Sequence, residues 1–173
     1  TLGVIFPNLS PQLLLVSRFN CIHKYVCDMK EENRLPGSGV NEEFLFAYES
    51  AFSVAETMNR IEHLLKAAGT PIFAKFDHGL NAKEVSLELR PTQVIVFGSP
   101  QVGTFLMQQE QSFSIELPLK IAVWEDKSGS VWIAFPRMNI RAEAYGRLTE
   151  NPIIAKMDSL LQNLARKAGD VYS

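Results

Sequence analysis

Asp77 and His78 adjoin each other in the segment "FAKFDHGLNAKE", residues 73–84, where an apolar run gives way to a polar one. Histidine exchanges a proton near neutral pH, and a carboxylate such as Asp77 or Glu84 can orient one of its ring nitrogens for acid–base catalysis. The pair can also contact a bound ligand. A third interpretation is structural, with the imidazole bonded to backbone or to Glu84. The chain contains no G-x-S-x-G motif to supply a serine nucleophile, so all three interpretations stay open.

A glycine-containing turn, "GSPQVG" from Gly98 to Gly103, follows the apolar run that ends at Phe97. It lacks the lysine of a Walker motif and the G-x-G-x-x-G spacing, so it does not indicate a nucleotide site. Its backbone amides could face an anion, but a strand end that needs Gly98 for its dihedral angles is the simpler explanation. Further on, Met107 and Gln108 pair an adaptable thioether with a polar amide, a combination that suits a ligand pocket or a dimer contact.

Metal-ligating side chains are few. Cys21, His23 and Cys27 fall together in "CIHKYVC", but zinc sites usually need four ligands, with a second pair elsewhere in the chain. A Cys21–Cys27 disulfide is sterically conceivable, and nothing in the sequence indicates it. Glu125 and Asp126 are better explained as the solvated shoulder of a hairpin than as paired catalytic acids. We therefore expect no metal and no cofactor.

The composition narrows the class of partner. The formal net charge is −2, so neither nucleic acid nor an anionic membrane is expected to bind. No run of about 18 apolar residues occurs, so no transmembrane helix is expected. Residues 1–28 lack the basic region and the cleavage site of a signal peptide, and we expect a soluble, cytoplasmic protein.

The distribution of apolar, charged and Pro/Gly residues divides the chain into two parts. Residues 1–40 are expected to form an N-terminal extension and linker, because Pro7 and Pro11 break short apolar runs and a charged Pro/Gly/Ser stretch follows. Residues 41–173 are expected to form a single α+β domain, since regular patterns begin there and the length suffices for one core.

Within that domain, capping residues and periodicity define the elements. Ser53 and Glu56 form a capping box before a helical apolar stripe, and Asn151 followed by Pro152 begins the terminal helix. "KSG", ending at Gly129, predicts a tight hairpin. Residues 101–117 read as a helical turn followed by an irregular segment. Strands are expected at 44–52, 70–78, 92–100, 119–126 and 130–136, and helices at 53–68, 80–89 (with Asn81 as a cap), 139–145 and 151–169.

This order favours a mainly antiparallel sheet with helices on one face rather than a parallel, doubly wound sheet. The second face would then be open and rich in Phe and Trp, and an open apolar face often meets a partner. Self-association through that face is therefore expected.

Five separate motifs follow one another along the chain. They are Asp77-His78 with Ala82, the strand from Leu89 to Pro100, Leu106-Met107-Gln108, Leu117 to Lys120, and Trp124-Glu125-Asp126. With these motifs in this order, residues 44–168 resemble the prokaryotic domain of unknown function family number 302. The resemblance implies a fold similar to the TATA-box-binding-protein-like arrangement of strand, helix, four strands, helix, and a homodimer. It implies no activity, cofactor or catalytic residue. Ser86 and Ser99 stand where the family commonly has Gly and Asn.

The leading hypothesis is a non-enzymatic small-molecule-binding or sensing homodimer. An enzyme using His78 as general acid/base, with Asp77 as its partner, is one alternative, and it requires an acid or serine beside His78 in a cleft. A structural or partner-binding protein that uses the open sheet face is the other. The predicted pocket residues are His78, Phe97, Gly98, Ser99, Met107 and Gln108.

Overall fold

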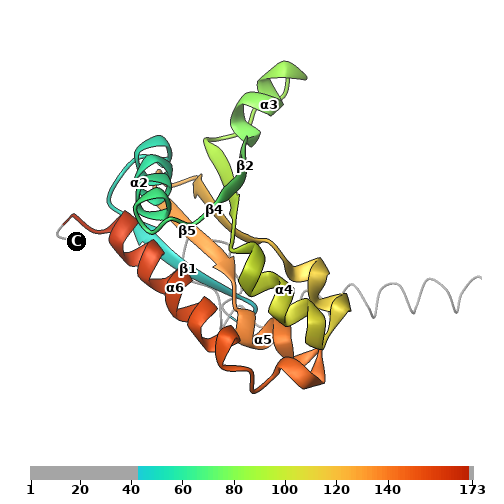
Figure 1. The fold of residues 1–173 in the computed structure, drawn as a ribbon. Coiled ribbons are helices and arrows are strands. Elements are labelled where there is room, and N and C mark those ends of the chain that lie inside the picture. The colour runs from blue at the N-terminus through green and yellow to red at the C-terminus, as the bar shows by residue number, and fades with distance from the viewer. Residues whose placement is uncertain (1–42, 172–173) are drawn as a thin grey trace, which may run out of the picture. The chain divides into compact units, whose positions relative to one another are not determined.

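A computed structural model of the chain describes residues 43–171. They form a five-stranded antiparallel sheet in the order β1-β5-β4-β3-β2, with helices around it (Figure 1). The strands are β1 (Leu45–Ser50), β2 (Ile72–Asp77), β3 (Thr92–Phe97), β4 (Leu119–Glu125) and β5 (Val131–Pro136). The helices are α2 (Val54–Ala67), α3 (His78–Glu84), α4 (Pro100–Gln109), α5 (Met138–Glu143) and α6 (Pro152–Gly169), with 3-10 turns η2 (Gln111–Glu116) and η3 (Gly146–Leu148).

The predicted α+β class with a mainly antiparallel sheet is confirmed. The longest helices, α2 and α6, stand where the strand–helix–four-strand–helix order requires them, and the shorter α3, α4 and α5 are inserted between. The likeness to the TATA-box-binding-protein arrangement stays an expectation. The expected division near residue 40, and the cluster of Cys21, His23 and Cys27, lie outside the described residues.

Helices α2 and α6 cover the same face of the sheet and enclose the core with it (Figure 1). Helix α2 begins as predicted, because the Ser53 hydroxyl accepts a hydrogen bond from the Glu56 N–H at 3.3 Å, and Gly69 follows it at a φ of 64°. Apolar side chains from both helices and from the central strands are fully buried, which supplies the main driving force for folding. They include Met58, Ile61, Leu65, Ile95, Ile121, Ile133 and Leu161.

The opposite face carries small and aromatic side chains, with Trp124 beside Trp132 and Ala122 beside Ala134 in the strand register. Among the described helices, Figure 1 shows none lying across this face. Trp132 is nevertheless buried, and its indole N–H donates to Asp126. Self-association through this face stays a prediction.

Asp126 closes the β4–β5 hairpin from inside, so its interpretation as a solvated shoulder residue is wrong. It is only 5% exposed, and it accepts hydrogen bonds from the Ser128 hydroxyl at 2.6 Å and the Trp132 indole at 2.9 Å. These bonds, helped by the backbone N–H groups of Ser128 and Ser130, lower its pKa to about 2. The carboxylate organises the turn that Gly129 completes at a φ of 87°.

Two segments differ from expectation. The helix expected from residue 80 begins at His78 instead, because Asp77 rather than Asn81 is its N-cap: Asp77 Oδ1 accepts from the Leu80 N–H at 2.9 Å. The segment after Gly98 is more helical than expected, since Ser99 caps α4 and Pro100 occupies its first turn. After α3 the chain turns at Ser86, whose φ of 59° explains why glycine would suit that position.

Candidate functional site

The candidate site is a cavity of about 500 Å³ at the end of the sheet where β3 finishes and β4 begins. Helix α4, the connection from η2 to β4, and one side of α6 close it. Its lining is mostly apolar and combines residues from four stretches of the sequence. They are Thr70, Phe73, Phe97, Gly98, Ser99, Pro100, Val102, Gly103, Thr104, Met107, Ser114, Leu117, Pro118, Leu119, Met157 and Leu160.

Gly103 leaves room for the cavity on the inner side of α4. A Cβ added there would lie 3.5 Å from Leu117 Cδ1 and 4.0 Å from Met107 Cε, so a larger side chain would enter the space between these residues. Gly98 allows a similar approach, because a Cβ at that position would lie 3.6 Å from the Phe73 ring. Because neither glycine has a side chain, Gly98 and Gly103 leave volume in the cavity that a larger residue would fill.

The polar groups of the lining are hydroxyls, and none of the lining side chains is ionisable. Two hydroxyls are already engaged with the backbone of α4: Thr104 donates to the Pro100 carbonyl at 2.7 Å, and Ser99 accepts from the Val102 N–H at 3.4 Å. Placing a charge in such a site is costly because nothing there would pair with it. The lining therefore suits an uncharged group better than a charged one, and it contains no ionisable side chain for proton transfer.

Four of the six predicted pocket residues, Phe97, Gly98, Ser99 and Met107, line this cavity. Gln108 points elsewhere: it is exposed and is not part of the lining. The sequence had no signal for the contributions of Met157 and Leu160, because both fit the apolar stripe of α6 and read as core.

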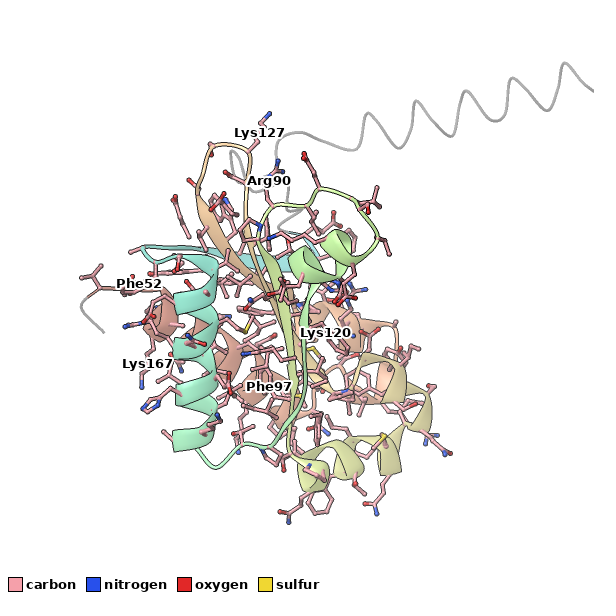
Figure 2. All side chains as sticks on the ribbon, turned by 90° about the horizontal axis from the view of Figure 1, so that it is seen from above. Phe52, Arg90, Phe97, Lys120, Lys127 and Lys167 are labelled. Atoms are coloured by element: carbon pink, nitrogen blue, oxygen red, sulfur yellow. The ribbon has the colours of Figure 1, made fainter. Side chains whose placement is uncertain are left out.

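His78 lies at the other end of the sheet. Strands β2 and β3 run antiparallel with Ile72 opposite Phe97 and Asp77 opposite Gln93, so His78 is separated from the Gly98 turn by the whole length of β2. At about 3.3 Å per residue this separation is about 20 Å. Figure 2 shows the same geometry, with Arg90 and Phe97 at opposite ends of β3. Within one chain, His78 does not share the cavity.

The surroundings of His78 and Asp77 also differ from those of a catalytic pair. His78 is exposed, and its ring stacks on Phe76 with the centroids 6.4 Å apart. Asp77 caps α3 and accepts from the Gln93 amide at 2.7 Å; the Leu80 N–H, followed by Gln93, lowers its pKa. Along residues 43–171 no acid or serine hydrogen-bonds the His78 ring, so the arrangement that the enzyme alternative requires is not found there. The same residues contain no cluster of three side chains suited to hold a metal.

The model of the family described as "Domain of unknown function DUF302" matches residues 46–164. The chain belongs to this family. A solved DUF302 protein from Bacillus stearothermophilus, an uncharacterized conserved protein, has a similar fold with a TM-score of 0.65 and 19% sequence identity. The match covers 72% of this chain and 98% of that one. It therefore supports the fold of the DUF302 domain alone.

Curated relatives of the DUF302 chain carry a more specific name. Over 98 residues it is 43% identical to proteins named fluoride-specific ion channel FluC 1 from Brucella suis and from Brucella abortus. The match covers 57% of this chain and spans 39% and 36% of the length of those relatives. For the part of this chain that the structure describes, no helix combines the length and the apolar character that a membrane span needs.

Proposed function

We propose that this DUF302 domain binds a small, neutral, largely apolar molecule in the cavity beneath α4 and works as a non-enzymatic binding or sensing homodimer. The observation that carries the proposal is the cavity itself, with an apolar lining, hydroxyls as its polar groups and no ionisable side chain. Its volume of about 500 Å³ falls among those of small-molecule sites. Burial of apolar ligand surface would supply the affinity, and the hydroxyls would orient any polar group of the ligand.

Gly103→Phe is expected to abolish this binding, or to weaken it at least about tenfold (about 1.4 kcal/mol). The new ring would occupy the space between Leu117 and Met107 that the glycine leaves open. Binding can be followed by a thermal-shift screen of neutral apolar metabolites, and then by calorimetry with the compounds that raise Tm.

Gln101→Phe is the matched control, because it adds the same ring to α4 at an exposed position outside the lining. It should leave the affinity unchanged. Equal binding by Gly103→Phe and the native chain would contradict the proposal, as would a screen in which no neutral apolar compound raises Tm.

The Brucella relatives support a second candidate, in which the domain acts as a regulatory module for a fluoride channel. Their printed name and the 43% identity are the observations that favour it. The cavity lining has no positive charge to hold a fluoride ion, so the module would respond to another molecule or to the channel itself. Fluoride efflux from vesicles that contain a FluC channel should change when this chain is added. An unchanged efflux rate would remove this candidate.

A further inference from the structure

We propose that two copies of the chain pair through the free edge of β2, and that this pairing brings His78 of the partner subunit to the mouth of the cavity. The inference rests on the homodimer proposed above and names its interface. The surface concerned is residues 73–89, here called the β2–α3 arm. It comprises most of β2, all of α3 and the segment that follows.

Exposed apolar side chains concentrate on this arm. Six of the eleven large apolar residues that are exposed in the described part of the chain belong to it. Figure 1 shows α3 at the tip of β2, away from the layer formed by α2 and α6. Leu80 and Leu89 share a surface pocket with Val54 and Ala55 at the start of α2, yet both keep about half of their surface exposed. A contiguous exposed apolar patch of this kind often serves an interaction with another molecule. The six are Phe73, Phe76, Leu80, Val85, Leu87 and Leu89.

The arm also contains an edge strand. In the sheet of the described residues β2 lies at one end and pairs only with β3. An edge strand presents unpaired N–H and C=O groups, which can hydrogen-bond a further strand. A partner that both extends the sheet and covers the arm would satisfy these groups and bury the apolar side chains together.

The exposed apolar area of the arm is large enough for an interface between two copies of the chain. If a fully exposed side chain of this size offers roughly 150 Å², the low end of the aromatic range, exposures between 46% and 65% give the six side chains about 500 Å² per copy. Complete coverage of these side chains in both copies would bury about 1,000 Å², which reaches the lower threshold for a specific interface. The arm contains two lysines and three acidic residues, a net charge of −1 per copy with His78 neutral, so the electrostatic repulsion between two arms is small.

Two-fold symmetry limits which residues of the two β2 strands can lie opposite each other. Two identical antiparallel strands related by a two-fold axis must have one residue that faces its own copy, because each side chain keeps its face of the sheet. Near the middle of β2 the choices are Ala74 and Lys75. An axis at Lys75 would oppose two long lysine side chains, each already paired with Glu62 at 3.0 Å, whereas an axis at Ala74 opposes two small side chains that let the strands approach. The geometry therefore favours Ala74.

With the axis at Ala74, the His78 of the partner subunit falls near Thr70, since each lies four residues from the axis and just outside β2. The register irregularity between Ile72 and Ala74 shifts this pairing by about one residue. Thr70 and Phe73 both line the cavity. The cavity then gains an imidazole that one chain alone places about 20 Å away. In such a dimer, His78 of the partner subunit would lie beside the predicted pocket residues Phe97, Gly98 and Ser99 of the first copy.

The first test measures the oligomeric state of the full chain by sedimentation velocity without any ligand. The native chain should be a dimer, and Leu87→Lys should raise its dissociation constant at least about tenfold. Leu87 is 65% exposed, so the change leaves the core intact, and circular dichroism verifies the fold. Ile115→Lys, at a residue that is 73% exposed but outside the arm, should remain dimeric. A monomeric native chain, or a Leu87→Lys chain as dimeric as the native one, would overturn the proposal.

The second test probes the register by cross-linking. In a background of Cys21→Ser and Cys27→Ser, the double variant Thr70→Cys/His78→Cys should form a disulfide-linked dimer under mild oxidation. Within one chain the two positions are too far apart for a disulfide, and each single variant should remain uncross-linked. Absence of the linked dimer from a dimeric double variant would refute the Ala74 axis. Because neither test involves a ligand, both can fail while the cavity still binds its molecule.

Discussion

Phe113→Ala is expected to lower the free energy of unfolding by about 3–5 kcal/mol. Phe113 is fully buried in η2, and its ring meets the Tyr145 ring edge to face with the centroids 5.0 Å apart. Removing it leaves a void that the 3-10 turn cannot fill, and it removes the aromatic contact as well. Urea denaturation followed by tryptophan fluorescence measures the change.

The same substitution should also weaken ligand binding, because Ser114 and Leu117 of the cavity wall lie just after Phe113 in the chain. Ile115→Ala is the matched control in the same 3-10 turn. Ile115 is 73% exposed, so this change should cost less than about 0.5 kcal/mol. Equal losses of stability in the two variants would show that η2 does not anchor this wall.

Gly169→Ala is expected to destabilise the protein by about 1–3 kcal/mol, although alanine is the better helix former. At this last residue of α6 a Cβ would lie 2.9 Å from two atoms of the Tyr48 ring and 3.4 Å from the Glu49 carbonyl oxygen. The Tyr48 hydroxyl donates to Asp170, which limits how far the ring can move away. Thermal and urea unfolding would measure the loss.

Gly103→Ala is the control for Gly169→Ala, because it makes the same change in α4, where a Cβ meets its nearest neighbours at ordinary distances. It should be neutral or stabilise by up to about 1 kcal/mol. In a Tyr48→Ala background the obstructing ring is gone, and Gly169→Ala should no longer destabilise. If Gly169→Ala still lowered the free energy of unfolding in that background, the Tyr48 ring would not be the source of the strain.

Much of the fold could be predicted because its signals are local. The Ser53 hydroxyl, the apolar stripe that follows it, and the turn at Gly129 each act on residues within a few positions in the chain, and each appears where the sequence indicated. The start of α3 was less predictable, because Asp77 and Asn81 are both good caps. The side chain of Asp77 also accepts from Gln93 on the neighbouring strand, a bond between residues sixteen positions apart.

The candidate site was predicted only in part, for a geometric reason. Residues that end one strand and begin the next helix, such as Phe97, Gly98 and Ser99, stay together in any fold, and they line the cavity. His78 comes directly after the preceding strand, β2, and antiparallel pairing places the end of β2 at the other end of the sheet from the Gly98 turn. Met157 and Leu160 line the cavity from α6, near the C-terminal end of the sequence. Their position depends on tertiary packing, which no local sequence pattern predicts.

The sequence by itself determined the α+β class, the caps of the longest helices and the glycine turn beside the cavity, since these follow from periodicity and from short-range hydrogen bonds. The family followed from the resemblance of several motifs that occur in order. Only the tertiary structure decided where the cavity lies, that Asp126 is buried, and that His78 stands exposed on an apolar arm. Those features depend on which strands become neighbours and in which direction they run. Asp77 and His78 therefore mark the family in the sequence, and in the folded chain they begin the helix at the tip of that arm.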